Sequence, residues 1–360
     1  MKILELIDSL APGGGERFVV DLSNALSLQN QVSLVKFRDK RNADFYNKDV
    51  ESRVKLISYP GKFDLFSKVK QIFEVIRIIK EERPDIVHAH LIAFNYIIIP
   101  VLIFNNIKFY YTVHNVADRD TNSSIDLYLK KWFFKRKVGA VTISELCERS
   151  FINLFGFKSK GVIENGCRNV TASDLAAETA SEIARYKKTS ATKVYVNIAR
   201  LMEQKNHELL IQSFNEFAKE NDAVLLIIGD YENNMILKEK LDQLITTDAV
   251  FFLGTKNNVG DYLLLTDFFC LSSKWEGLPI SLLEAGICGT FPICTPVGGI
   301  PDVIINETWG ILTKDLTVAS YVEALERSFK LNTNREEVRR RYTERYLMSI
   351  CADKYEQIFK

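Results

Sequence analysis

The sequence predicts an α/β protein built from two Rossmann-like, doubly wound domains. Short apolar segments of strand character alternate with amphipathic helical segments along the whole chain, and polar or glycine-rich residues follow several of the strands. The 360 residues, of which 47% are hydrophobic, are enough for two cores. We place the first domain at residues 1–166 and the second at residues 167–341. A C-terminal helix, about 342–360, is expected to pack back on the first domain.

In the first domain, apolar segments predict strands at Ile3–Ile7, Val32–Phe37, Ile86–His88, Phe109–His114, Ala140–Ser144 and Gly161–Ile163. Between them, apolar residues recur at helical spacing in Phe18–Leu28 and Phe66–Glu82. The alternation of strand and helix indicates an open parallel sheet, whose ligands bind beyond the carboxyl ends of the strands.

The second domain repeats this pattern without obvious sequence repetition. Its strands are predicted at Val194–Ile198, Val224–Gly229, Val250–Gly254, Phe268–Ser272 and Phe291–Thr295. Its helices are predicted at His207–Glu220, Asn234–Thr246, Ile280–Gly286 and Val318–Leu331. The polar segment Asn165–Ser190, rich in Ala, Ser and Thr, suits an interdomain connection, and Arg335–Phe359 is predicted as one long final helix.

Charge and hydropathy exclude several classes of protein. The net charge of +1 does not suggest strong nucleic-acid binding. Residues 1–165 carry 25 Lys and Arg against 19 Asp and Glu, whereas residues 166–360 carry 22 against 27, so the first half is expected to face any anionic surface. The six cysteines show no CxxC spacing, and the apolar segment after Lys2 is too short for a secretory signal. Both observations favour a cytosolic protein. The longest apolar run, Leu91–Phe104, is shorter than the ~20 residues of a membrane span.

Two carboxylates, Glu276 and Glu284, flank a predicted loop-to-helix junction. Pro279 suits the first turn of a helix that we expect to begin at about Leu278, and Gly277 permits close approach of the backbone to a ligand. The free N–H groups and the positive end of such a helix attract phosphate. The segment could therefore hold a nucleotide sugar. The simpler alternative is an amphipathic helix with a solvated Glu at each end.

Two cations, Arg200 and Lys205, follow the strand that begins at residue 194. Fixed positive charges at a strand end can neutralise a diphosphate and stabilise it as it leaves. Taken alone, the pair could equally be surface bases on a loop. After the first strand, Gly13, Gly14 and Gly15 could bring backbone amides against phosphate or against an acceptor, although a plain tight turn is the alternative and neither a Walker A nor a GxGxxG pattern is present.

Together these segments resemble the retaining GT-B glycosyltransferases of glycosyltransferase family 4, also called glycosyl transferases group 1. The combination of Glu-x7-Glu with Arg-x4-Lys is specific, and the matching segments run in family order from residue 12 to about 311. The individually weaker matches are Gly13–Arg17, Asp85–His90, Thr112–His114, Val141–Glu145, Val162–Gly166, Ile228–Asp230, Phe252–Gly254 and Gly298–Asp302. The resemblance implies an acceptor domain followed by a nucleotide-sugar donor domain, facing a central cleft.

The resemblance also implies roles for individual residues. Glu276 would hold the donor sugar near its reacting carbon, Glu284 the ribose, and Arg200 and Lys205 the diphosphate, while His114 would reach the donor sugar and the acceptor. The further residues expected to contact the nucleotide are Gly14, Gly15, Leu253, Gly254, Gly277, Leu278, Pro279 and Ile280. Departures from the usual pattern at Ala199, Asp230–Glu232 and Asp302 leave the details of base and phosphate contact open.

No metal site is expected. His88 and His90 alternate on a predicted strand and point the same way, but no third ligand is in view, so we interpret them as hydrogen-bonding residues of the core or the cleft wall. Asp118 and Asp120 have the Asp-x-Asp form that metal-dependent sugar transferases use. That motif belongs to a different fold, and we interpret it here as a solvated turn.

The basic, aromatic segment Lys130–Lys137 has two interpretations. Apolar residues at helical spacing favour a helix packed on the sheet, whereas the mixture of Lys and aromatic residues is also typical of a membrane interface. The two interpretations overlap, because lysine stems can lie over apolar residues while their ammonium groups stay in water.

These inferences predict a cytosolic, metal-independent retaining glycosyltransferase. It would move a hexosyl unit from a nucleoside diphosphate sugar, with UDP as the expected nucleotide, to a carbohydrate or lipid-linked acceptor in bacterial surface-polysaccharide synthesis. No separate cofactor and no nucleic-acid partner are expected, and weak contact with the inner face of the plasma membrane is a further expectation. Two alternatives stay open: a GT-B-fold sugar-nucleotide epimerase and a non-catalytic sugar-nucleotide-binding subunit.

Overall fold

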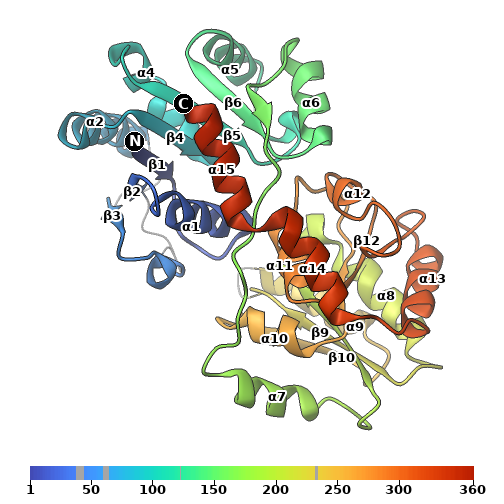
Figure 1. Cartoon of the computed structure of the whole chain (residues 1–360). Helices are drawn as coiled ribbons and strands as arrows, with labels where there is room; N and C mark the ends of the chain where they lie inside the picture. Colours follow the sequence, from blue (N-terminus) through green and yellow to red (C-terminus); the bar gives the residue numbers. More distant parts are fainter. Residues whose placement is uncertain (38–43, 60–64, 122, 232–233) are drawn as a thin grey trace. The chain divides into compact units, whose positions relative to one another are not determined.

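The chain folds into two compact units, each built on its own parallel sheet (Figure 1). The computed structural model describes residues 1–37, 44–59, 65–121, 123–231 and 234–360. Unit 1 consists of Met1–Arg168 and Met348–Lys360, and unit 2 of Asn169–Leu347. We expected the chain to pass between domains at about residues 166 and 341, and it does so at residues 168 and 347. Two Rossmann-like domains are thus confirmed.

Unit 1 contains seven parallel strands in the order β3-β2-β1-β4-β5-β6-β7. The strands are β1 (Lys2–Ile7), β2 (Gln31–Lys36), β3 (Val54–Ser58), β4 (Ile86–His90), β5 (Lys108–Val113), β6 (Val138–Thr142) and β7 (Gly161–Val162). The longer helices are α1 (Gly14–Leu26), α2 (Leu65–Glu82), α5 (Ser124–Arg136), α6 (Glu145–Phe155) and α15 (Met348–Phe359), with the short α3 (Phe94–Ile97) and α4 (Pro100–Ile103) after β4. The edge strand β3 was not predicted, because Val54 is its single buried residue and the others, such as Lys55, are exposed or partly exposed.

The two faces of the unit 1 sheet are covered by different helices. Leu4, Val87 and Tyr111 belong to a core that also contains residues of α2, α3, α5 and α6. Side chains alternate between the faces of a strand, so Glu5 and His88 point to the opposite face. There α1 and α15 lie (Figure 1), and they pack against each other.

Helix α15 is fastened to unit 1 by hydrogen bonds to its central strands. The Lys108 ammonium donates to the carbonyl oxygen of Phe359, and the Tyr110 hydroxyl donates to that of Ile358. Farther along the helix, the Asn30 amide donates to the Glu356 carboxylate over 2.6 Å. The last helical residues therefore complete the cover of the β1–β4–β5 face.

Unit 2 contains six parallel strands in the order β10-β9-β8-β11-β12-β13. The strands are β8 (Lys193–Ile198), β9 (Ala223–Ile228), β10 (Val250–Gly254), β11 (Phe268–Leu271), β12 (Phe291–Cys294) and β13 (Ile311–Leu312). The helices are α7 (Ala176–Ala184), α8 (His207–Phe217), α9 (Met235–Leu244), α10 (Val259–Leu265), α11 (Ile280–Ile287), α12 (Ile300–Val303), α13 (Val318–Phe329) and α14 (Arg335–Tyr346). Strand β11 lies beside β8 although they are far apart in sequence, which brings the residues after both strands to one region of the sheet edge.

Three local predictions need correction. The connection Asn165–Ser190 is not irregular throughout, because α7 forms within it and buries Thr179 and Ile183. The final helix is two helices: Leu347, with extended backbone, ends α14 before α15 begins. Helix α11 begins at Ile280 rather than at about Leu278.

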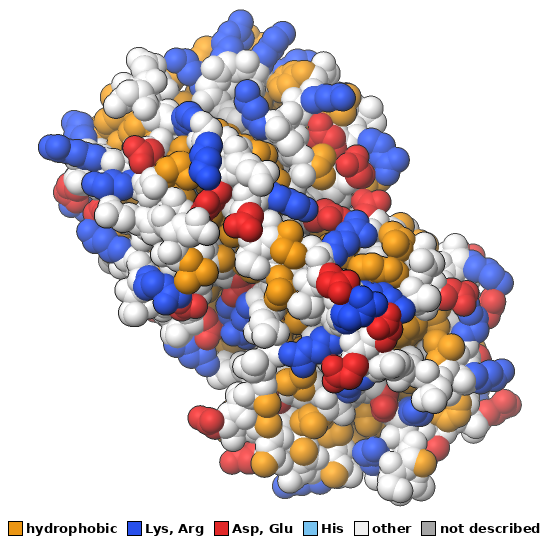
Figure 2. Space-filling model, viewed as in Figure 1, with side chains coloured by type: hydrophobic (Ala, Val, Ile, Leu, Met, Phe, Trp, Pro, Cys, Tyr) orange, Lys and Arg blue, Asp and Glu red, His pale blue; other side chains and the backbone are white. Residues whose placement is uncertain are grey.

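Surface features of the structure bear on membrane contact. No helix within the described residues combines the length and apolar character needed to cross a membrane. Figure 2 shows Lys and Arg side chains spread over the viewed face of the chain, with Asp and Glu side chains among them. On this face the basic residues do not form one continuous patch.

Candidate active site

In unit 2, the structure brings together two of the predicted residues from segments far apart in the chain. Lys205 lies in the 3₁₀ turn that follows β8, and Glu276 lies in the loop that follows β11. Because these two strands are neighbours, the Lys205 Nζ atom lies 2.6 Å from Glu276 Oε1. The Glu276 side chain is 6% exposed and that of Lys205 16%, so the ion pair is largely screened from water. The attraction between the two opposite charges offsets part of the free energy that removing each of them from water costs.

The Glu276 carboxylate is held by two further side chains. The Ser273 hydroxyl donates to Oε1 over 2.6 Å, and the Gln204 amide donates to Oε2 over 3.4 Å. The same Gln204 amide nitrogen also donates to the Trp275 carbonyl oxygen at 2.8 Å. These bonds fix the carboxylate in place beside the ammonium group.

The backbone around Glu276 is packed so closely that one neighbouring position must be glycine. Gly298 has φ +61°, and a Cβ atom there would lie 2.1 Å from the Glu276 carbonyl oxygen. Next to it, the Gly299 amide donates to the Gly277 carbonyl oxygen at 2.6 Å. The Gly-Gly pair after β12 therefore supports the loop that carries Glu276.

The start of α11 differs from the prediction. Pro279 is the N-cap residue, with extended backbone (φ −71°, ψ 123°), and Gly277 and Leu278 precede the helix in a buried loop. Proline has no N–H, so Pro279 cannot donate a backbone hydrogen bond to a phosphate. Ile280 is the first helical residue, and Glu284 lies inside α11, with its side chain buried. The helix start thus lies two residues nearer to Glu284 than we expected.

The other predicted donor-binding residues lie at the same carboxyl edge of the unit 2 sheet. Arg200 follows β8, is exposed, and forms no ion pair with any residue of the described ranges. Leu253 and Gly254 end β10 and are half-buried. Gly254 has φ +70°, and its carbonyl oxygen accepts from the Gly229 amide. The structure thus gathers these predicted residues on one edge without assigning a ligand to them.

In unit 1, the predicted glycines lie within a helix rather than in a turn before it. Helix α1 begins at Gly14, so Gly14 and Gly15 form its first turn, after Gly13 as the extended N-cap residue. A Cβ atom on Gly15 would lie 3.1 Å from Leu91 Cδ1. Close packing against the residue that follows β4 therefore gives Gly15 a structural role of its own.

His114 follows β5 and is the outermost member of a buried polar cluster. Its Nε2 atom lies 3.0 Å from His90 Nδ1, and the His90 Nε2 atom lies 2.8 Å from Glu5 Oε2. Glu5 also interacts with His88 Nδ1 at 3.2 Å, and His88 Nε2 lies 2.8 Å from the Thr112 hydroxyl. Glu5, His88 and His90 are completely buried.

Burial and mutual contact set the charges of this cluster. Burial raises the pKa of the Glu5 carboxyl, but attraction to His88 and hydrogen bonds from both histidines outweigh it and lower the pKa to about 2. Burial lowers the pKa of His90 to about 4. Burial, with repulsion from the other two histidines, holds the pKa of His114 well below its usual range. His90 and His114 are therefore neutral at pH 7.

Glu5 was missed in the sequence. Its signal is a single carboxylate in the otherwise apolar strand Lys2–Ile7, and the register pairs it directly with His88. Glu5, His88 and His90 also form the one group of three possible metal ligands found among the described residues. Their nitrogen and oxygen atoms are already engaged in the hydrogen bonds above, so the cluster is complete as a hydrogen-bonded network.

We expected the Asp-x-Asp segment to be a solvated turn, but only one of its two carboxylates is exposed. Asp118 is exposed, whereas Asp120 accepts from the Tyr111 hydroxyl at 2.8 Å and pairs with Lys130 Nζ at 3.2 Å. Burial raises the pKa of Asp120. Asp120 thus links the middle of α5, through Lys130, to Tyr111 of β5. The predicted packing of the basic segment holds for Lys130, which is buried.

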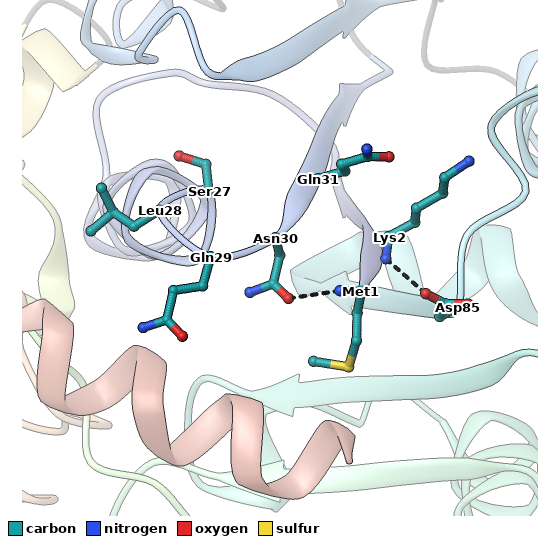
Figure 3. A pocket seen from close by; sticks show the side chains of 8 residues that line it. All are labelled: Met1, Lys2, Ser27, Leu28, Gln29, Asn30, Gln31 and Asp85. Atoms are coloured by element: carbon teal, nitrogen blue, oxygen red, sulfur yellow. Dashed lines mark hydrogen bonds between the residues drawn. The ribbon is translucent and has the colours of Figure 1, made fainter.

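One hollow lies away from all of these residues (Figure 3). It is bounded by the amino ends of β1 and β2 and by the end of α1, with Met1, Asn30 and Asp85 among its lining residues. The Lys2 amide donates to the Asp85 carboxylate within it. Since ligands of parallel sheets bind at the carboxyl ends of the strands, we assign no role to this hollow.

Comparison with known proteins identifies the family. Residues 12–168 match the family Glycosyltransferase Family 4, and residues 179–345 match Glycosyl transferases group 1. The chain belongs to the GT-B glycosyltransferases of family 4. Its two Rossmann-like units are the two domains of that fold.

Individual family 4 relatives and structures agree with this assignment. An uncharacterized glycosyltransferase of Methanocaldococcus jannaschii is 31% identical over 61% of this chain and 57% of its own length. A UDP-Gal:alpha-D-GlcNAc-diphosphoundecaprenol alpha-1,3-galactosyltransferase of Escherichia coli is 26% identical over 73% of this chain and 71% of its own. The Anabaena protein HepE, solved with UDP-glucose, superposes with a TM-score of 0.83 at 18% identity, over 99% of this chain and 98% of that one. The chain spans about half the length of the first curated relatives it matches.

Proposed function

We propose that this chain transfers a hexosyl unit from a nucleoside diphosphate sugar, with UDP as the nucleotide, to a sugar or lipid-linked acceptor in bacterial glycan synthesis. The observation that carries the proposal is the screened Lys205–Glu276 pair beside the start of α11. It places a cation and a fixed carboxylate side by side, so that one nucleotide sugar could contact both groups. The named activity of the Escherichia coli relative, which uses UDP-Gal and a diphosphoundecaprenol-linked acceptor, supports both substrate classes.

In the proposed reaction, Lys205 and Arg200 neutralise the diphosphate as the bond to the sugar breaks. Charge develops on the leaving oxygen, and fixed cations in a partly dry site stabilise it more than water would. The buried Glu276 carboxylate accepts hydrogen bonds from sugar hydroxyls. The Ser273 hydroxyl holds this carboxylate in place before the substrate binds. Glu284, inside α11, accepts from the ribose hydroxyls.

We further propose that the anomeric configuration of the donor is kept and that no divalent ion is required. Arg200, Lys205 and the N–H groups at the start of α11 supply the positive charge that a metal ion would otherwise supply. Among the described residues we assign no carboxylate the role of a base that could drive inversion. A phosphate oxygen of the donor is then the group that takes the proton of the incoming hydroxyl.

The acceptor is assigned to unit 1, where His114 contacts the reacting sugar and the incoming hydroxyl. A lipid-linked acceptor would require contact with a membrane surface. Helix α5 offers suitable residues, because Ile125, Tyr128 and Leu129 are exposed apolar side chains and Lys131 and Lys135 are exposed cations on the same helix. We therefore propose weak peripheral binding to the cytoplasmic face of the plasma membrane through α5.

The test is transfer by the purified chain from UDP-glucose, UDP-galactose and UDP-N-acetylglucosamine to an undecaprenyl-diphosphate-linked sugar, with and without EDTA. We expect one donor to be consumed, EDTA to leave the rate within twofold, and NMR coupling of the new anomeric proton to match that of the donor. Binding of UDP-sugars without hydrolysis or transfer would favour a non-catalytic subunit. Conversion of the donor to a second UDP-sugar would favour an epimerase. An inverted product would contradict the mechanism.

A further inference from the structure

The polar cluster of unit 1 forms a directed chain of hydrogen bonds from a buried carboxylate to His114. Strands β1, β4 and β5 are adjacent, and their register places Glu5 beside His88 and His90 beside Thr112. The chain then runs from Glu5 Oε2 to His90 Nε2 over 2.8 Å, and from His90 Nδ1 to His114 Nε2 over 3.0 Å. The two nitrogens of His90 therefore have different partners, the Glu5 carboxylate at Nε2 and the His114 ring at Nδ1.

Only one placement of protons satisfies both bonds when the imidazoles are neutral. An ionised carboxylate can only accept, so His90 must carry its proton on Nε2. Its Nδ1 atom then has a lone pair and must accept from His114, which therefore carries its proton on Nε2 as well. The remaining nitrogen of His114, Nδ1, is left as an acceptor. No residue of the described ranges is hydrogen bonded to it.

We propose that Glu5 and His90 are positioning residues that hold His114 in the Nε2–H tautomer, so that its Nδ1 accepts a hydrogen bond from a sugar hydroxyl. This inference rests on the proposed function. A neutral acceptor selects a hydroxyl group over a phosphate or carboxylate oxygen, which has no proton to give. Selection for a hydroxyl group at this position is therefore built into unit 1.

The lowered pKa values of His90 and His114 agree with this arrangement. A second proton on His90 would put hydrogens on both of its nitrogens and break its bond to His114, and a second proton on His114 would remove the acceptor at Nδ1. His88 stands outside it. The Tyr355 and Thr112 hydroxyls are 2.8 Å apart, and Thr112 lies 2.8 Å from His88 Nε2. If Tyr355 donates to Thr112, then Thr112 donates to His88 and leaves the His88 proton on Nδ1, directed at Glu5.

The direct test is ¹⁵N NMR of the histidine side chains at pH 7, which needs no enzyme assay. The chain has four histidines, so each can be assigned by one substitution. We expect His90 and His114 both to show a protonated Nε2 and an unprotonated Nδ1. A protonated Nδ1 on His114 would contradict the inference, whether or not the chain proves to be a glycosyltransferase. So would one Zn²⁺ bound per chain with shifted His88 and His90 resonances.

Glu5→Gln tests the link to function. Its amide offers one oxygen to two histidines, so one of them must switch tautomer. A switch of His88 would leave the buried Tyr355 O–H without an acceptor, whereas a switch along His90 ends at the open His114 Nδ1. We therefore expect His114 to become protonated on Nδ1 and kcat to fall at least tenfold, with the Kd for UDP unchanged.

Thr112→Val is the matched control, because it alters the partner of His88 and leaves the Glu5–His90–His114 chain intact. Its His114 tautomer should be that of the wild type, and its turnover should stay within twofold. If Glu5→Gln lowers turnover without changing the tautomer, or leaves both unchanged, Glu5 does not hold the tautomer. Donor hydrolysis without acceptor separates the two possible hydroxyl sources: a loss there places the hydroxyl on the donor sugar, and a loss only in transfer places it on the acceptor.

Discussion

The carboxyl edges of the two sheets carry opposite kinds of chemistry on the same architecture. In unit 2 the residues after β8 and β11 form an ion pair, Lys205 with Glu276, and the exposed Arg200 follows the same strand. In unit 1 the residues at the ends of β4 and β5 form a chain of imidazoles that are neutral at pH 7. The difference teaches that one fold can carry an ion pair at the edge of one sheet and neutral imidazoles at the edge of the other, which suits the charged and hydroxyl groups that we propose as their ligands.

The largest expected effect is loss of positive charge in unit 2. Lys205→Ala and Arg200→Ala should each lower turnover by roughly 10²–10³, the usual scale for removal of one preorganised electrostatic group. Lys219→Ala is a matched control, because Lys219 pairs with Glu216 on the surface of the same unit, with both side chains exposed. Near-wild-type turnover in either site variant would contradict the assignment.

A smaller effect should separate the two carboxylates of unit 2. Glu276→Gln should lower kcat by about tenfold or more, because we propose that the fixed carboxylate contacts the reacting sugar, whereas Glu284→Gln should mainly raise the Kd for free UDP. Steady-state kinetics and UDP titration distinguish the two results. If both variants change only the affinity for the donor, the role given to Glu276 is wrong.

Acid should destabilise unit 1 before unit 2. The pKa of His90 is lowered from 6.5 to about 4, as is that of His207 in unit 2, and the pKa of His114 is also lowered. In the unfolded chain these groups bind protons near pH 6.5. Each therefore contributes stability that is present above pH 6.5 and lost as the pH falls toward its folded pKa. For His90 and His207, whose pKa is lowered to about 4, this contribution is about 3 kcal/mol each.

Unit 1 holds two such histidines against one in unit 2, so its urea midpoint should fall more steeply between pH 7 and pH 4. Single-tryptophan variants that keep Trp132 in unit 1 or Trp309 in unit 2 report the two units separately. His207→Phe is the control, because neither ring nitrogen of His207 has a hydrogen-bond partner among the residues that the structure describes. It should flatten the pH dependence of unit 2 alone. Equal slopes for both units in the wild type would contradict the prediction.

The smallest expected effect concerns membranes. Ile125→Ser combined with Tyr128→Ser on α5 should weaken binding to vesicles of anionic phospholipid a fewfold, and wild-type binding should decline as salt rises. Ile236→Ser is the matched control, because Ile236 is equally apolar and 84% exposed but lies in unit 2. Vesicle flotation measures both. Equal losses in the two variants, or no binding by the wild type at low salt, would contradict docking through α5.

The central strands could be predicted because they are buried on both faces and read as continuous apolar runs. The short strands β3 and β13 at the sheet edges could not, because they bury few residues. Helix α7 was missed for a related reason: its composition resembles a polar linker, and only Thr179 and Ile183 are buried. The break at Leu347 has neither Pro nor Gly to announce it.

For the site, the sequence predicted which charged residues gather on the edge of the second sheet, because strand ends and motif spacing are local features. It did not predict that Lys205 pairs with Glu276, or that Glu5 anchors the histidines, since both depend on which strands are neighbours. Glu5 looks like an isolated charge until β1 and β4 are aligned. Strand order is a property of the whole sheet.

The single-residue break between α14 and α15 separates the two units and so affects the order in which they fold during synthesis. Unit 2 is one continuous stretch of chain, whereas unit 1 needs Met348–Lys360, which the ribosome makes only after the whole of unit 2. The α15 face of the first sheet, with His88 and the Tyr355 contact to Thr112, thus stays uncovered until synthesis of this stretch is complete. The half that is translated first is therefore the half that finishes folding last, and a nascent chain stalled before residue 348 should hold a finished second domain and an open first one.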